Sequence, residues 1–213
     1  MSEPLSVRAR FERFPATVKG AFILRGEDAD PHQVVLHGGR VMAIGSGGSG
    51  SMPLEPAILD VVPHRDVFVP FELGVSELEP GWYTLVCDLE VDGVRGAYDG
   101  GKRFSVSWPR AAVRRGHLKI DRELPLGDAK VRLEHADCGG DSIKLHLRVV
   151  PPGPLTLKLT VDGRRLDLLE IVLDEASGRA RATAYPLMRA DETLQIQLRG
   201  RRGTEAAIDV PLS

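Results

Sequence analysis

The feature that most restricts the fold of this chain is the alternation of apolar and polar residues at every second position. The stretch SIKLHLRVV, residues 142–150, shows this most clearly, with apolar side chains at Ile143, Leu145, Leu147 and Val149. The polar side chains between them are Lys144, His146 and Arg148. A period of two places successive side chains on opposite faces of an extended strand. This segment is therefore predicted to be a strand with one buried face and one face in water.

Segments of this kind recur along the whole chain. In the first half they cover residues 7–14, 17–24, 33–38, 40–44, 57–62, 66–75, 81–91 and 102–108. In the second half they cover residues 117–120, 129–135, 142–150, 155–161, 165–173, 179–185, 193–199 and 206–212. They are short, rich in β-branched and aromatic residues, and separated by Gly, Pro and Asp, which predicts strands. This spacing favours an all-β sandwich architecture over alternating strands and helices.

A helical period is not evident anywhere in the chain. Its nearest approach is RLDLLEIVLDEASG, residues 165–178, and the flanking VDG and SGR turns favour a hairpin there. A length of 213 residues suits two domains of about 100 residues each. The character of the sequence changes at residues 108–116, WPRAAVRRG, which suit a linker or an outer strand. We therefore predict two consecutive antiparallel β-sandwich domains, residues 1–108 and 109–213.

The first domain contains a run of Gly and Ser over residues 45–51. Such a run cannot bury apolar surface, so we expect a mobile loop that tolerates deletion. The run lacks the Gly-Lys-Ser/Thr sequence of a phosphate-binding loop. It also lacks the following helix that a nucleophile elbow needs.

The two halves of the chain echo one another weakly. EPGWYTLVCDLEVDG, residues 79–93, aligns with PPGPLTLKLTVDG, residues 151–163, if a two-residue gap is allowed. Such a gap preserves which side chains face inward. Duplication of one domain could produce this similarity, and so could two independent hairpins with the same turn chemistry.

One motif links the first half to a known superfold. The order Leu-x-Pro-Gly-x-Tyr-x-Leu, from Leu78 to Leu85, resembles the tyrosine corner of immunoglobulin-like sandwiches. The resemblance implies that Tyr83 lies early in strand F and that its hydroxyl bonds to backbone upstream. Antibody domains have a cysteine where this chain has Leu85, and the tryptophan of strand C has no evident counterpart. The resemblance is therefore to disulfide-free members of the immunoglobulin- and fibronectin-like superfold, and it identifies no particular family.

The same stretch contains Cys87, which shares a strand face with Tyr83 and Leu85. A thiol among such neighbours behaves as a small hydrophobic group, so Cys87 is predicted to be a core residue and not a nucleophile. The only other cysteine, Cys138, lies 51 positions away, and this pair does not make a disulfide framework.

A short polar segment, HADCGGD, offers several metal-ligating groups: His135, Asp137, Cys138 and Asp141. A tetrahedral zinc site would need a second cluster, and the nearest histidine, His146, is predicted on the outward face of another strand. The segment is therefore interpreted as a polar hairpin loop.

The remaining titratable groups form no recognisable site. Asp28 and Asp30 lack the glycine and distal glutamate of a calcium loop and are interpreted as a turn. The other histidines are scattered in the sequence: His32, His37, His64 and His117. We therefore predict no catalytic residue, no cofactor-binding residue and no metal ligand, and we predict that the protein is not an enzyme.

Charge and targeting signals limit the partners that we expect. A net charge of −2 provides no electrostatic reason to bind nucleic acid or an acidic membrane. The N-terminal residues lack the apolar region of a signal peptide, and no apolar run is long enough to span a bilayer. These features, with an excess of arginine over lysine that is typical of GC-rich genomes, predict a cytoplasmic bacterial protein.

Arginines also cluster at predicted strand ends of the second half: Arg114, Arg115, Arg164, Arg165, Arg199, Arg201 and Arg202. They could form one basic edge, but acidic residues are interspersed and aromatic residues for base stacking are scarce. The function that we predict is therefore non-catalytic binding of another protein, as in scaffolding or assembly, through sandwich loops and strand edges. The alternative is a ligand- or carbohydrate-binding accessory module, and homo-oligomerisation stays open.

Overall fold

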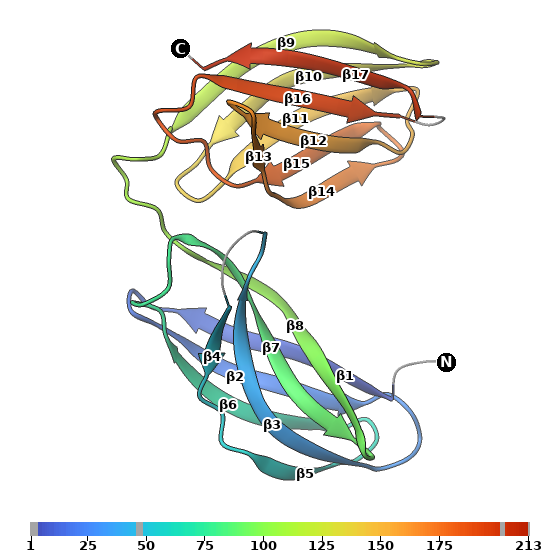
Figure 1. Cartoon of the computed structure of the whole chain (residues 1–213). Helices are drawn as coiled ribbons and strands as arrows, with labels where there is room; N and C mark the ends of the chain where they lie inside the picture. The colour runs from blue at the N-terminus through green and yellow to red at the C-terminus, as the bar shows by residue number, and fades with distance from the viewer. Residues whose placement is uncertain (1–3, 46–48, 201–202, 213) are drawn as a thin grey trace. The chain divides into compact units, whose positions relative to one another are not determined.

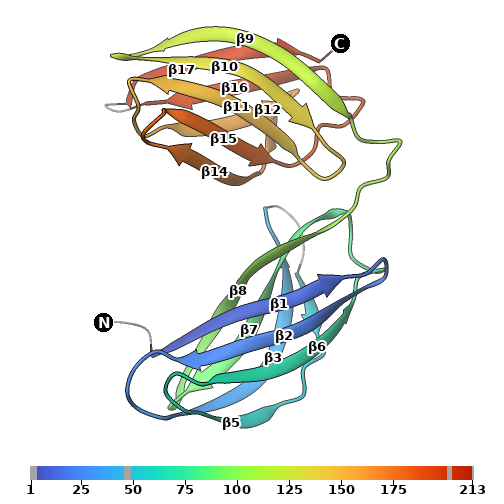
Figure 2. The same ribbon diagram turned by 180° about the vertical axis from the view of Figure 1, so that it is seen from behind.

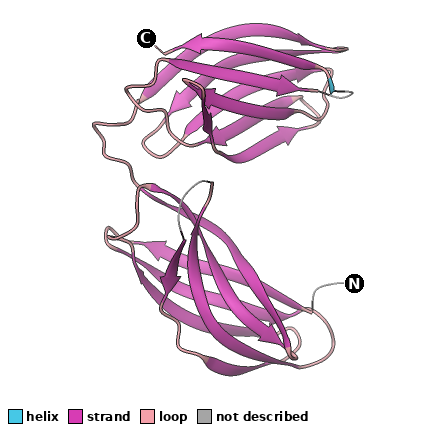
Figure 3. Cartoon of the chain, viewed as in Figure 1, coloured by secondary structure: helices cyan, strands magenta, loops and turns pink. Residues whose placement is uncertain are grey.

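The computed structural model describes residues 4–45, 49–200 and 203–212. Strands account for nearly all of the regular structure in this part of the chain, which contains no α-helix; the short segment drawn in cyan in Figure 3 is a 3-10 turn at Gly203. The chain divides into two compact units, Met1–Val106 and Ser107–Ser213. The sequence had placed the boundary after Trp108. Each unit is described by itself.

The first unit contains two antiparallel sheets (Figures 1 and 2). One has the order β1-β2-β6, and the other has the order β4-β3-β7-β8, with β5 paired to β3 as well. The strands are β1 (Leu5–Arg13), β2 (Thr17–Gly26), β3 (His32–Ala43), β4 (Ser49–Met52), β5 (Ala57–Val61), β6 (Asp66–Gly74), β7 (Gly81–Val91) and β8 (Val94–Val106).

Both sheets of the first unit contribute to one apolar core. Phe22 of β2, Leu36 of β3 and Leu85 of β7 are each at most 1% exposed and belong to the same cluster. Two sheets that bury their facing side chains against each other form the two layers of a β-sandwich. The alternation that marks the sequence is therefore the signature of these two inner faces.

The second unit also contains two antiparallel sheets, in the orders β14-β15-β11-β10-β9 and β13-β12-β16-β17. Its strands are β9 (Gly116–Leu126), β10 (Ala129–Cys138), β11 (Ile143–Val150), β12 (Thr156–Val161), β13 (Arg164–Leu166), β14 (Leu168–Asp174), β15 (Arg179–Ala184), β16 (Thr193–Arg199) and β17 (Glu205–Pro211). The inward residues predicted for β11 lie in a core shared by both sheets, with Ile143 and Leu145 fully buried.

Two segments were predicted with the wrong number of strands. Residues 33–38 and 40–44 were predicted as separate strands but form the single strand β3, with a register shift between Leu36 and Gly38. A bulge of this kind lets one strand continue although its alternation is interrupted. Residues 165–173 were predicted as one strand, but they divide at Asp167 into β13 and β14, which belong to different sheets.

The predicted Gly/Ser loop over residues 45–51 is shorter than expected. Ser49 to Ser51 lie in β4, where Gly50 pairs with Val41 and Ser51 pairs with Arg40 of β3. Residues 46–48 lie outside the described part of the chain. Since three of the seven residues are part of a sheet, deletion of the entire run is no longer expected to leave stability unchanged.

The echo between the two halves reflects local turn chemistry. Both segments end in an Asp-Gly turn with positive φ: 50° and 84° at Asp92 and Gly93, 47° and 79° at Asp162 and Gly163. These are the conformations that tight hairpin turns require. However, β7 is followed by one further strand of its unit, whereas β12 is followed by five. The matched segments therefore occupy different positions in the two units, which favours independent hairpins over duplication.

The segment after β8 belongs to the second unit and packs against other residues of that unit, so it is not a free linker. Val113 is fully buried and forms a β-bridge with Met188. The ring of Trp108 contacts that of Tyr185 edge-on, with centroids 5.4 Å apart.

Candidate functional site

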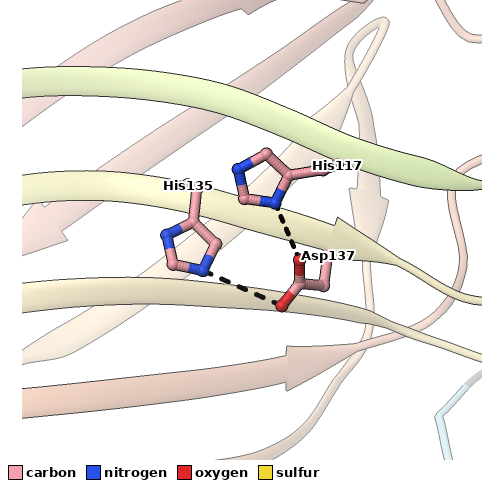
Figure 4. Close-up of side chains that lie close together, drawn as sticks. All are labelled: His117, His135 and Asp137. Carbon is pink, nitrogen blue, oxygen red and sulfur yellow. Dashed lines mark hydrogen bonds and ion pairs between the residues drawn. The ribbon is translucent and has the colours of Figure 1, made fainter.

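Three histidines and one aspartate meet on the outer face of the five-stranded sheet of the second unit. His117 comes from β9, His135 and Asp137 come from β10, and His146 comes from β11. Figure 4 shows His117, His135 and Asp137 with their side chains directed toward one another. These three strands are consecutive in the sheet, in the order β11-β10-β9, so His117 and His146, 29 positions apart in the sequence, both lie next to the residues of β10.

A bulge in β10 turns two of these side chains outward. Val131 and Leu133 face the core, and so do Ala136 and Cys138, so the alternation changes phase between them. The register with β11 shifts between Leu133 and His135, which makes Glu134 the extra residue. Without this bulge, the period of two would place His135 and Asp137 on the core face. The bulge instead places His135 directly opposite His146.

The Asp137 carboxylate lies at the centre of the cluster. His117 Nδ1 lies 2.9 Å from Asp137 Oδ1, and this pair is hydrogen-bonded. His146 Nε2 lies 3.2 Å and His135 Nε2 lies 3.8 Å from Asp137 Oδ2. All three imidazoles therefore direct one nitrogen toward the same carboxylate.

The histidine rings also contact one another. Those of His135 and His146 are stacked, with centroids 4.3 Å apart and an interplanar angle of 16°. Those of His117 and His135 are tilted, with centroids 4.7 Å apart. The Nε2 atom of His146 is shielded from solvent and makes no hydrogen bond of acceptable geometry, despite its short distance from Asp137. The cluster therefore contains a buried polar atom whose bonding capacity is unused.

The surroundings of Asp137 favour its charged form. The hydrogen bond from His117 and the nearby imidazoles hold the pKa of the Asp137 carboxyl below its usual range. Basic residues lie opposite the cluster in the register, Lys144 beside Asp137 and Arg181 beside His146. Within the described residues, no lysine or arginine forms an ion pair with Asp137. The ion-pair partners of the Asp137 carboxylate among the described residues are therefore the three histidines.

The sequence identified only part of this cluster. Of the four ligating groups in HADCGGD, His135 and Asp137 belong to it, whereas Cys138 faces the core and is 8% exposed. Burial raises the pKa of the Cys138 thiol, which disfavours its thiolate form. Asp141 lies beyond the end of β10 and is not among the clustered residues. The segment is also not a hairpin loop up to Cys138, because β10 extends to that residue.

His117 was missed because its position 18 residues upstream of His135 carries no recognisable spacing. The signal that could have found it is the succession of two predicted strands, residues 117–120 and 129–135, because successive strands joined as a hairpin are neighbours in a sheet. His146 was assigned correctly to an outward face, and the structure adds that β11 lies next to β10.

A fourth histidine, His32, lies between two aspartates in the first unit. Its Nδ1 is 2.5 Å from Asp92 Oδ2, its Nε2 is 2.7 Å from Asp28 Oδ1, and the residue is 7% exposed. Hydrogen bonds to Asp92 and Asp28 raise the pKa of His32. With both ring nitrogens engaged, His32 joins the turn before β3 to the turn after β7 and is not available as a general base.

The tyrosine and cysteine of β7 lie where the sequence placed them. The Tyr83 hydroxyl donates a hydrogen bond of 2.8 Å to the backbone carbonyl of Glu79. Cys87 is fully buried, and this burial raises the pKa of its thiol to about 12. A thiol with such a pKa is not a nucleophile at neutral pH.

The arginine clusters of the second unit are partly neutralised. Arg164 lies 3.6 Å from Asp191, and Arg199 lies 3.8 Å from Glu205. Arg114 donates hydrogen bonds to the backbone carbonyls of Arg189 and Asp191. Arg201 and Arg202 lie outside the described residues.

A further surface feature is the free edge of the sheet at β14. This strand pairs with β15 on one side only. Ile171 and Val172 of β14 are 40% and 44% exposed. The opposite sheet ends in β13, which precedes β14 in the chain. β13 has only three residues, whereas β14 has seven.

Comparisons with known proteins show similarity in solved structures alone. No protein family model matches the chain, and no curated protein matches it. A conserved domain protein from Bacillus anthracis is 15% identical, with a TM-score of 0.37; the match covers all of this chain and 89% of that one. A marsupial T cell receptor is 10% identical, with a TM-score of 0.28, and the match covers 99% of this chain and 62% of the receptor chain. These comparisons identify no family. Among the described residues, no helix is long and apolar enough to cross a membrane.

Proposed function

We propose that the chain is a non-catalytic module of two consecutive immunoglobulin-like β-sandwiches that binds another protein. The strand order supports the superfold, because β10-β11-β15-β14 and β13-β12-β16-β17 follow the pattern of an A-B-E-D sheet facing a C′-C-F-G sheet. In the first unit, β1-β2-β6 and β4-β3-β7-β8 correspond to A-B-E and C′-C-F-G. Tyr83 then lies at the start of strand F, where tyrosine corners occur.

The observation that carries the binding function is the free edge at β14. An edge strand offers unpaired backbone donors and acceptors, and soluble proteins usually protect such strands with lysine, proline or short length. β14 has neither lysine nor proline, and it exposes Ile171 and Val172. A partner that adds an extended strand would satisfy the backbone groups and cover both side chains.

The charges on this edge favour a partner of different sequence over a second copy. If two β14 strands paired antiparallel about Val172, Glu170 of one would lie opposite Asp174 of the other. Like charges directly opposite each other in a sheet are destabilising. We therefore expect a partner segment with an apolar residue opposite Val172 and basic residues two positions to either side.

The proposal is tested by purifying the full chain from its native source with cross-linking and identifying bound proteins by mass spectrometry. Val172→Lys should abolish capture of the partner, because it places a lysine on the free edge. Val94→Lys is the matched control, since Val94 is 72% exposed and belongs to the first unit. Hydrogen exchange should show protection of β14 amides in the complex. Capture that survives Val172→Lys, or self-association through β14, would contradict the proposal.

A further inference from the structure

We propose that His117, His135 and Asp137 form a binding site for a divalent transition metal ion of the zinc type on the outer face of the second unit. The metal-ligating atoms of these three side chains all lie within 4.8 Å of one another. The site is independent of the β14 edge, because it lies at the β9 side of the sheet and β14 forms the opposite edge.

The distances suit a metal of this size. Zinc binds imidazole nitrogen at about 2.0–2.1 Å, and a tetrahedral arrangement then separates neighbouring ligand atoms by about 3.3 Å. His117 Nδ1 lies 2.9 Å from Asp137 Oδ1, and His135 Nε2 lies 3.8 Å from the other carboxylate oxygen, Oδ2. Because one ligating atom from each of the three residues lies within 4.8 Å of the others, small rotations of the side chains would bring three ligand atoms around one ion.

The ligand chemistry selects the class of metal. Imidazole nitrogens suit zinc, copper and nickel, whereas magnesium and calcium require sets of oxygen ligands. Two imidazoles and one carboxylate are the ligand set of several open zinc sites, in which water or substrate occupies the fourth position. Here the fourth position would face solvent, because His117 and Asp137 are 58% and 51% exposed in their side chains.

His146 has a different role from the three ligands. Its Nε2 lies 3.2 Å from Asp137 Oδ2, is shielded from solvent and is without a hydrogen bond of good geometry. A metal that draws Asp137 Oδ1 would leave Oδ2 to accept a hydrogen bond from His146. Such outer partners orient the ligating groups, and their loss typically weakens binding by about 10–100-fold.

The competing interpretation is an anion site, because Lys119, Lys144 and Arg181 border the cluster in the register. An anion bound at the cluster would have to approach the carboxylate of Asp137, which lies between the histidines. The imidazole nitrogens converge on that carboxylate. A carboxylate and imidazole nitrogens that point toward one another can bind a cation, whereas the negative carboxylate would repel an anion.

The test is isothermal titration of the full chain, prepared without a polyhistidine tag, with Zn²⁺ at pH 7.5. We expect one equivalent to bind, with loss of measurable binding in His117→Gln and in His135→Gln. His146→Gln should weaken binding by about 10–100-fold without abolishing it. Affinity should fall as the pH falls, because protons compete with the metal for the imidazole nitrogens.

The matched control is His37→Gln, which removes a histidine that bonds a carboxylate, Glu90, in the first unit. This variant should bind Zn²⁺ as the unmodified chain does. Circular dichroism of each variant confirms that its fold is retained. Unchanged Zn²⁺ binding in His135→Gln, no Zn²⁺ binding by the unmodified chain, or binding of inorganic phosphate in place of Zn²⁺ would overturn the proposal.

Discussion

Substitution of Tyr83 by phenylalanine isolates the contribution of one hydroxyl to the stability of the first unit. The Tyr83 residue is 5% exposed, and its ring stacks on Phe104 with centroids 5.6 Å apart. Phenylalanine keeps this packing, so no cavity forms. What is lost is the 2.8 Å hydrogen bond to the carbonyl of Glu79.

The magnitude follows from the surroundings of the two partners. A hydrogen bond contributes about 1 kcal/mol net, and an acceptor left unpaired in the interior costs about 1–3 kcal/mol. Glu79 is an exposed residue, so water can reach its carbonyl and the cost belongs at the lower end, about 1–2 kcal/mol. For a domain of this size, that lowers the melting temperature by about 4–8 °C.

The assay is differential scanning calorimetry of the full chain, with hydrogen exchange of β7 amides to assign the transition to the first unit. Tyr98→Phe is the control, because Tyr98 also packs against the core of this unit. Among the described residues, the Tyr98 hydroxyl makes no hydrogen bond. If Tyr83→Phe lowers the melting temperature no more than Tyr98→Phe does, the hydrogen bond of the tyrosine corner has no stabilising role and the reasoning is wrong.

Three further predictions concern the first unit. Cys87→Ser should cost about 1–3 kcal/mol in denaturant melts, because it places a hydroxyl in the core, whereas Cys87→Ala should cost less; rapid thiol labelling of the native protein would contradict the buried position. The raised pKa of His32 means that its stabilising contribution is complete below the pKa of an unfolded histidine, about 6.5, and is lost as pH rises through the higher folded value. Melting temperatures should therefore fall from pH 6 to pH 9 in the unmodified chain and change less in His32→Gln, while equal pH dependence would refute this assignment. Gly20→Ala should lower the melting temperature sharply, because the added Cβ would collide with the Arg10 carbonyl, whereas Gly74→Ala, with open space around it, should be neutral.

The sequence by itself determined most strands and their inner faces. Alternation places side chains on opposite faces of any extended segment, so Ile143, Leu145 and Cys87 could be assigned to the core without knowledge of their neighbours. The tyrosine corner could also be predicted from the sequence, because the Tyr83 hydroxyl donates its hydrogen bond to a backbone carbonyl only four residues away. These features depend on local geometry, which a sequence pattern records directly.

The tertiary structure alone decided which strands are neighbours and where alternation changes phase. The bulge at Glu134 turns His135 and Asp137 outward, and the pairing of β9, β10 and β11 brings His117 and His146 to them. The sequence pattern likewise did not predict that residues 165–173 divide between two sheets. This division leaves β14 as an edge strand. A bulge and a strand pairing are stabilised by contacts between segments distant in the sequence, and a period of two carries no information about such contacts.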